Sequence, residues 1–405
     1  MHKKFTIAFF ILFCLNLSSQ NIKSIQLRPT QENNFSAIVP LGTILELSFD
    51  DLDADSKEYQ YKIEHMTHDW KSSRLSSSQY IDGFDQNTII DVTNSFNTFQ
   101  NYTHYSVKIP NINTVITKSG NYLLSVLNYD EEVIFTKRFV LYENATTIGV
   151  SVERSRNTKT LNTQQTVQFS VNHPNLTINN PNQEINVVLL KNNNWNEKIV
   201  NLQPTFFKQN QLLYTYTNKT NFWGGNEYLN FDNKIIRNNS LNVVRVVKKD
   251  IFHHYLYPFK YNPFREYKYN PDINGQFVIR TLEAEDSKTE ADYAMMHFSI
   301  LANEPFIDKK VYIYGAFNDF EITDENEMIY NADEKTYLGS ILLKQGFYNY
   351  TFVTTDTNNT VNIKDINGSF YQTENEYTVI VYYKPFGSFY ERVIGVGTGF
   401  FNQNR

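Results

Sequence analysis

Cysteine is almost absent from this chain of 405 residues, which contains only Cys14. Cys14 lies in an N-terminal segment with the features of an export signal: two lysines are followed by an apolar run over residues 5–15 and a polar exit over residues 16–20. We therefore predict that residues 1–20 are a signal peptide and that the mature chain begins near Asn21. Without a thiol, the mature chain has no disulfide, no thiolate metal ligand and no cysteine nucleophile.

Long hydrophobic runs are also missing after residue 20. No later stretch reaches the roughly 18 apolar residues that a membrane-spanning helix needs, which excludes an integral helical membrane protein and argues against a retained anchor. A lipid anchor on Cys14 is disfavoured because the large Phe13 precedes it. We expect the chain to be exported from the cytoplasm.

A surplus of positive charge is missing as well. The chain has 37 Lys and Arg against 43 Asp and Glu, a net charge of −6, and loss of Lys3 and Lys4 with the signal peptide makes the mature chain more acidic. Nucleic-acid binding requires clustered Lys and Arg that neutralise phosphates. We therefore exclude nucleic acid as a partner.

Aromatic residues are abundant instead, with 31 Phe and 28 Tyr. Together with frequent Asn, Thr, Val and Ile, they favour strands joined by turns over helices. Apolar residues alternate with polar ones in these sets: Leu45, Leu47 and Phe49; Tyr59, Tyr61 and Ile63; Tyr105, Val107 and Ile109; Val167, Phe169 and Val171; Tyr377, Val379, Val381 and Tyr383. This period of two predicts an all-β fold of β-sandwich domains.

Pauses in the alternation divide the mature chain into three predicted domains. The first spans residues 21–143, the second residues 144–275 and the third residues 276–405. The third ends in a glycine-rich segment that includes Gly395, Gly397 and Gly399. No helix follows these glycines to hold a phosphate, so we interpret the segment as a flexible tail.

An aromatic segment interrupted by proline covers residues 255–269. Pro258 and Pro263 prevent it from forming a regular central strand, because proline has no N–H to donate to a neighbouring strand. Two interpretations remain open: the segment packs over the edge of a sandwich, or it presents an apolar surface to a partner.

Acidic and histidine clusters do not form a recognisable metal site. Asp51, Asp53 and Asp55 resemble the start of a calcium loop, but Ser56 stands where the loop requires glycine and Lys62 where it requires glutamate. We interpret this run as a solvated hairpin turn.

The histidines are equally unconvincing as ligands. His65 and His68 lie near Asp69 without the HExxH pattern, and in a strand residues three apart point to opposite faces. The adjacent His253 and His254 have no third ligand. We therefore expect no metal and no cofactor.

Catalytic signatures are missing too. No Gly-x-Ser-x-Gly elbow is present and no cysteine nucleophile remains, and no pair of carboxylates stands out as an acid and base. We expect the protein to be non-enzymatic, with no catalytic residue and no small-molecule substrate.

A set of short motifs along the chain resembles the plug protein family of the type IX secretion system. Each motif alone is weak, but together they follow the family's order over nearly the whole mature chain. In the first predicted domain the motifs are Leu47–Leu52, Tyr61–His65, Asp69–Trp70, Tyr80–Phe84, Tyr102–Tyr105 and Ser119–Leu124; later ones are Gly224–Glu227, Asp272–Gly275, Glu290–Tyr293, Lys344–Tyr350 and Thr373–Tyr377.

The resemblance implies a periplasmic protein of Gram-negative bacteria, built from tandem immunoglobulin-like β-sandwich domains. It implies a peripheral association, without membrane insertion, with the giant outer-membrane translocon barrel, whose pore the protein would seal sterically while no cargo shuttle is engaged. Exposed aromatic side chains would suit such an interface. Our candidate partner-binding residues are Tyr255, Tyr257, Phe259, Tyr261 and Phe264.

The third predicted domain also resembles the early-set immunoglobulin module found beside starch- and glycogen-active enzymes. Its motifs are Val311–Phe320 and Lys344–Phe352. A secreted carbohydrate-binding protein is therefore the alternative, although Phe320 stands where such modules usually carry a sugar-stacking tryptophan. An outer-membrane barrel is disfavoured, because many of the strands are short and carry charges on both faces.

Overall fold

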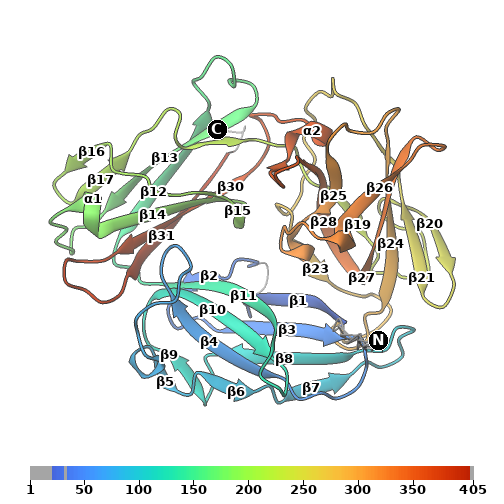
Figure 1. The fold of residues 1–405 in the computed structure, drawn as a ribbon, viewed down its shortest axis with the longest axis horizontal. Helices are drawn as coiled ribbons and strands as arrows, with labels where there is room; N and C mark the ends of the chain where they lie inside the picture. The colour runs from blue at the N-terminus through green and yellow to red at the C-terminus, as the bar shows by residue number, and fades with distance from the viewer. Residues whose placement is uncertain (1–20, 32–33, 402–405) are drawn as a thin grey trace, which may run out of the picture.

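The computed structural model describes residues 21–31 and 34–401, so the predicted signal peptide lies outside the described residues. The predicted all-β fold of tandem sandwiches is confirmed: several sheets make up nearly all of the regular structure, with only two helices of four residues, α1 (Pro181–Glu184) and α2 (Lys364–Asn367), in the described residues. Figure 1 shows the strands gathered into three groups around a common centre. No helix of the described part is long and apolar enough to cross a membrane.

The first unit is a sandwich of two main sheets. One sheet has the order β1-β3-β8-β7, formed by β1 (Ile22–Pro29), β3 (Leu45–Asp51), β8 (Thr103–Ile109) and β7 (Asp91–Asn94). The other has the order β2-β11-β10-β4-β6, formed by β2 (Ile38–Pro40), β11 (Val133–Tyr142), β10 (Gly120–Leu127), β4 (Gln60–Met66) and β6 (Gln86–Thr88). β5 (Ile81–Gly83) pairs with β9 (Thr114–Ile116) beside them.

The core of the first unit follows the predicted alternation. Leu45, Leu47 and Phe49 of β3 face Tyr61 and Ile63 of β4, and all five side chains are buried in one cluster. Because successive strand residues point to opposite faces, the polar residues between them face away from this core.

The second unit is a sandwich built from two distant parts of the chain. One sheet has the order β12-β13-β17-β16, with β18 also paired to β13; its strands are β12 (Thr147–Arg154), β13 (Gln164–Asn172), β17 (Gln211–Tyr214), β16 (Phe206–Lys208) and β18 (Asn221–Trp223). The opposing sheet has the order β15-β14-β30-β31, formed by β15 (Asn194–Ile199), β14 (Ile185–Lys191), β30 (Glu376–Tyr383) and β31 (Arg392–Phe400).

The pairing of β30 with β14 corrects the predicted boundaries of the second and third domains. We assigned residues 376–405 to the third domain, but Ile185 of β14 is opposite Tyr383 of β30, and the ladder continues to Lys191 opposite Tyr377. Alternation identifies a strand but not its partner, which here lies almost 200 residues away in the sequence.

The glycine-rich segment is an ordered edge strand, not a flexible tail. On β31, a Cβ added at Gly395 would lie 2.2 Å from Oγ1 of Thr146, and one added at Gly397 would lie 2.7 Å from Cβ of Ile148. Glycine at every second position therefore lets β12 pack directly against the backbone of β31.

The third unit is inserted between β18 and β30. Its continuous sheet has the order β19-β28-β25-β26-β27-β24-β21-β20: β19 (Leu229–Asp232), β28 (Gly346–Thr355), β25 (Lys310–Tyr314), β26 (Glu327–Asn331), β27 (Thr336–Lys344), β24 (Tyr293–Leu301), β21 (Phe252–Leu256) and β20 (Val243–Lys248). β22 (Phe259–Lys260) also pairs with β24, while β23 (Phe277–Ile279) and β29 (Val361–Asn362) pair with β28. Phe231 of β19 and Phe252 of β21 share one buried cluster, so the sheet curls around a single core.

Candidate interaction surface

A buried ionic cluster joins the first unit to the third. Nζ of Lys344 lies 2.7 Å from Oδ2 of Asp50, and the hydroxyl of Tyr293 donates to the same oxygen at 2.6 Å. Nδ1 of His104 lies 2.6 Å from Oδ1 of Asp50. Burial alone would raise the pKa of Asp50, but the charge of Lys344 and the hydrogen bond from His104 outweigh it and hold the pKa below its usual value.

A second contact fixes the same two units. The carboxylate of Asp292 accepts hydrogen bonds from the backbone N–H groups of Phe99 at 2.7 Å and Gln100 at 3.1 Å. The hydroxyl of Tyr102 donates to the carbonyl of Ala291 at 2.8 Å. Satisfied polar groups of this kind restrict the relative orientation of two units, because any shift leaves buried groups unpaired.

The remaining two interfaces close a ring of three units. Between the first and second units, the rings of Trp70 and Trp195 meet edge to face at 4.9 Å, and the hydroxyl of Tyr382 donates to Oδ1 of Asn121 at 2.8 Å. Strand β30 packs against both units through its two faces. Val379 and Val381 face the core of the second unit, while Ile380 and Tyr382 face the first unit.

The second and third units are also in direct contact. Nδ2 of Asn194 donates to the hydroxyl of Tyr314 at 3.1 Å, and Nδ2 of Asn196 donates to the carbonyl of Phe320 at 2.7 Å. Each unit therefore contacts both of the others, and the relative positions of the three units are fixed at three places.

The five candidate partner-binding residues do not share one exposed surface. Phe259 is only 8% exposed and packs in the core of the third unit, so its side chain is not available to a partner. Tyr255 stacks on His297 at 4.4 Å, and Tyr261 meets Phe306 at 5.1 Å. These three side chains are used within the third unit.

Tyr257 and Phe264 are the two candidates that face solvent. They are 61% and 89% exposed and lie on either side of β22. The segment 255–269 therefore contains aromatic side chains of both kinds: some pack on the sheet, while others, Tyr257 and Phe264 among them, face solvent.

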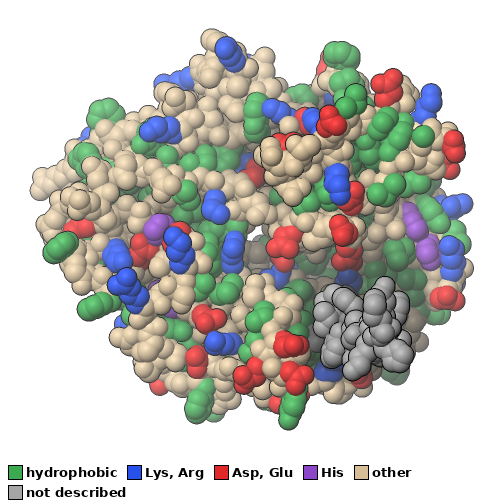
Figure 2. All heavy atoms as spheres, viewed as in Figure 1, with side chains coloured by type: hydrophobic (Ala, Val, Ile, Leu, Met, Phe, Trp, Pro, Cys, Tyr) green, Lys and Arg blue, Asp and Glu red, His purple; other side chains and the backbone are tan. Residues whose placement is uncertain are grey.

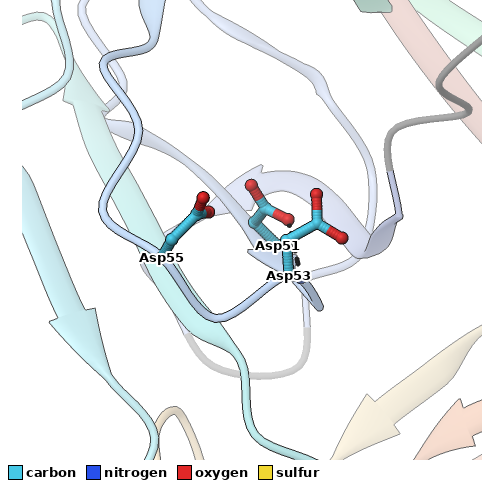
Figure 3. A group of neighbouring side chains, drawn as sticks. All are labelled: Asp51, Asp53 and Asp55. Carbon is cyan, nitrogen blue, oxygen red and sulfur yellow. Dashed lines mark hydrogen bonds between the residues drawn. The ribbon is translucent and has the colours of Figure 1, made fainter.

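The acidic run is paired with a lysine of the same chain. Figure 3 shows the carboxylates of Asp51, Asp53 and Asp55 turned toward one another, and their oxygens lie within 4.8 Å of one another. Nζ of Lys57 lies 3.0 Å from Oδ2 of Asp51 and 3.4 Å from Oδ1 of Asp55, and it also pairs with Asp53. An ammonium group thus occupies the place that a cation would take.

His65 and His68 make separate contacts and do not form a common site. His65 is buried beside Tyr80 and Tyr122, and burial lowers its pKa to about 4. Nδ1 of His68 lies 2.8 Å from Oε2 of Glu391, a contact between the first and second units that raises the pKa of His68. The two side chains are not brought together around a common point.

The second histidine pair is also divided. Nε2 of His254 lies 2.8 Å from the carbonyl oxygen of Ile236, whereas Nδ1 of His253 lies 2.9 Å from Nε2 of His297. The pKa of His297 is lowered to about 4 by burial and by the nearby positive charges. Each imidazole therefore already has a partner within the third unit.

The early-set motif does not present a ring to solvent. Phe320, at the position of the sugar-stacking tryptophan, is 5% exposed and packs against Tyr314 at 5.2 Å. The structure therefore gives no support to the carbohydrate-binding alternative.

Sequence reasoning missed the exposed aromatic residues that lie outside the segment 255–269. Phe206 and Phe207 lie exposed on the edge strand β16, and Phe386 and Phe389 lie exposed in the loop between β30 and β31. These phenylalanines stand among turn-forming residues in the sequence, and that position is the signal that could have predicted their exposure. Figure 2 shows hydrophobic side chains at several separate places on one face, with charged side chains of both signs between them.

The fold and these surfaces define the chain as an assembly of β-sandwich units locked together by buried interfaces. The family model described as the type 9 secretion system plug protein 1st domain matches residues 22–143, which cover the first unit. The chain belongs to the type IX secretion system plug protein family.

A solved structure supports the arrangement of all three units. The chain is similar to a hypothetical protein from Parabacteroides merdae ATCC 43184, with 32% sequence identity and a TM-score of 0.90. The match covers 94% of this chain and 97% of the other. A search of curated proteins found no match.

Proposed function

We propose that this protein is a non-enzymatic periplasmic plug that docks on the outer-membrane barrel of the type IX translocon and closes its pore by steric obstruction. Membership of the plug family supports the association with the translocon. The proposal locates the activity in the shape and outer contacts of the molecule, with no reactive side chain involved.

The observation that carries this proposal is the closed ring of interfaces between the three units. A body that obstructs a wide pore must keep its shape under load, and units joined by flexible linkers would not. Here Asp50 with Lys344, Trp70 with Trp195, and Asn194 with Tyr314 fix the three interfaces. The exposed Tyr257 and Phe264 are proposed as anchors, since aromatic side chains bury much area at low entropic cost.

A stable seal requires an interface well above about 1,000 Å² of buried surface. We therefore expect docking to survive detergent extraction. The test is affinity purification of a tagged copy from membranes of a host that lacks its own copy. Recovery of a very large outer-membrane barrel protein is expected, and its absence from repeated preparations would exclude docking.

Sealing is tested separately from docking. Deletion of the protein in a host with an assembled translocon should increase entry of a large hydrophilic dye or antibiotic, and the tagged copy should restore the barrier. Unchanged permeability after deletion, with the barrel still present, would contradict the steric role while leaving docking intact.

A further inference from the structure

A groove opens where the three units meet. It consists of two adjoining cavities of about 330 Å³ and about 420 Å³, both lined by Gln26, Arg28 and Phe35. The first cavity is also lined by Trp195 of the second unit and Phe277 of the third. Figure 2 shows that the surface is hollowed near the centre of this face, where the three groups of strands in Figure 1 meet.

Arg28 is a basic side chain that lines both cavities of this groove. Its Cζ lies 5.8 Å from the ring centroid of Phe35 and 5.7 Å from that of Phe277, so the guanidinium sits between two aromatic rings. Within the described residues, the structure records no hydrogen bond and no ion pair of this guanidinium. Burial lowers the pKa of Arg28 to about 10, and the nearby Tyr348 and Glu46 offset this effect only in part.

The lysines that line the same cavities all have carboxylate partners. Lys137 pairs with Asp319 at 2.5 Å, and Lys288 pairs with Glu46 at 2.7 Å. Lys344 pairs with Asp50, as described above. Arg28 thus differs from these lysines, as does Arg138, which lines only the first cavity and lies 4.9 Å from the ring centroid of Trp70. The five N–H donors of Arg28 form a planar fork that matches a carboxylate.

The walls of the groove favour an extended peptide. Strand β1, which carries Arg28, ends its sheet and pairs only with β3, while β23 pairs only with β28 among the described strands. Residues of both strands line the cavities, from Ser24 to Arg28 on one side and from Phe277 to Ile279 on the other. An unpaired strand edge offers backbone N–H and C=O groups to a further strand.

We propose that the groove between β1 and β23 binds an extended peptide segment through a carboxylate that pairs with Arg28. The carboxylate belongs to a chain end or to an acidic side chain of the segment. The inference does not depend on docking to a barrel, because it concerns the protein by itself.

Isothermal titration of the mature protein provides the test. The probe is an acetylated hexapeptide of alternating valine and serine, made with a free C-terminal carboxylate, as the C-terminal amide, and as the amide with one internal aspartate. We expect the free acid to bind and the plain amide to bind about tenfold more weakly or not at all, because a charge-assisted pair is lost. Binding of the aspartate form instead of the free acid assigns the carboxylate to a side chain.

Two variants separate binding from folding. Arg28→Met should lower the affinity for the carboxylate peptide at least about tenfold, while Arg237→Met, at an exposed arginine outside the groove, should leave it unchanged. Since Arg28 is partly buried and has no ion pair with any described residue, Arg28→Met should also melt at the same temperature as the parent or higher. Absence of binding by all three peptides at millimolar concentration, binding that Arg28→Met does not weaken, or a clearly lower melting temperature for Arg28→Met would overturn the proposal.

Discussion

Lys344 of the third unit and Asp50 of the first form an ion pair in which both side chains are 1% exposed. The two residues are separated by almost 300 positions in the sequence. Without Lys344, the buried carboxylate of Asp50 would keep only its contacts with Tyr293 and His104, which makes the pair a sensitive point of the ring.

Lys344→Met should lower the free energy of unfolding by about 3–5 kcal/mol, because Asp50 would remain buried and charged. The measurement is guanidinium unfolding followed by tryptophan fluorescence. Lys71→Met, at a lysine whose side chain is 79% exposed, is the control and should leave stability unchanged within error. The double variant Lys344→Met with Asp50→Asn should recover part of the loss. Equal stability of Lys344→Met and the control would contradict the assigned role of the pair.

Asp272 should make the protein less stable as pH rises. Burial raises the pKa of Asp272 from 3.8 to about 7, with further contributions from Glu227 and Glu374. Between these two values the folded state keeps a proton that the unfolded state has lost, so stability is full below the unfolded pKa and decreases until pH passes the folded pKa.

The measurement is the melting temperature across this pH range for the parent and for Asp272→Asn. Asparagine retains an oxygen that can accept from the backbone N–H of Tyr228 or Asn274. The variant should lose less stability than the parent between pH 4 and pH 7. Parallel curves for the two proteins would show that Asp272 does not titrate in this range.

Gly397→Ala should destabilise the second unit. The added Cβ would lie 2.7 Å from Cβ of Ile148 and 2.8 Å from its carbonyl oxygen, so β12 must move away from β31. We expect a loss of about 2 kcal/mol in unfolding free energy, typical of overpacking. Gly149→Ala is the matched control, because its Cβ would approach only the side-chain oxygen of Ser170 at 3.3 Å. A neutral effect at Gly397 would mean that the two strands are separated more easily than the packing indicates.

Calcium should not stabilise the parent protein, because the ammonium of Lys57 already lies among the carboxylates of Asp51, Asp53 and Asp55, where the ion would have to bind. Lys57→Ala removes the ammonium and leaves three converging carboxylates. We expect millimolar calcium to raise the melting temperature of this variant and not that of the parent. A calcium-dependent rise in the parent would show that the ion displaces Lys57.

Substitutions in the aromatic segment 255–269 should have two different effects, depending on whether the side chain is exposed or buried. Tyr257→Ala and Phe264→Ala should reduce recovery of the barrel in the affinity experiment without changing the melting temperature, since both side chains are exposed. Phe259→Ala should instead lower stability by about 3–5 kcal/mol, because its ring is buried against Phe352. Full recovery of the barrel with the double variant Tyr257→Ala and Phe264→Ala would remove these residues as anchors.

Local pattern was sufficient to predict where strands form. In β3 the alternation of Leu45, Leu47 and Phe49 corresponds to buried positions, because a strand with one face on a core must alternate. The same reasoning did not separate the roles within residues 255–269, since burial of Phe259 and exposure of Phe264 depend on where the segment crosses the sheet.

Long-range pairing was not readable from the sequence. Nearly every residue of β30 is buried, on both faces of the strand. The alternation of Tyr377, Val379 and Val381 predicts burial of only one of these faces. The other face is buried because the first unit packs on it through Ile380 and Tyr382. Such a contact depends on the arrangement of units and leaves no periodic signal within one strand.

The sequence by itself determined that the chain is all-β and that no cysteine follows Cys14. Residue composition and a period of two act locally on each strand, so no long-range information is needed to predict strands. Only the tertiary structure decided that the C-terminal strands complete the second unit, that Lys57 occupies the acidic turn, and that Arg28 lies near Phe35 and Phe277 in the central groove. These features depend on which distant segments meet, and side-chain pairing across such contacts is set by the packing of the whole chain.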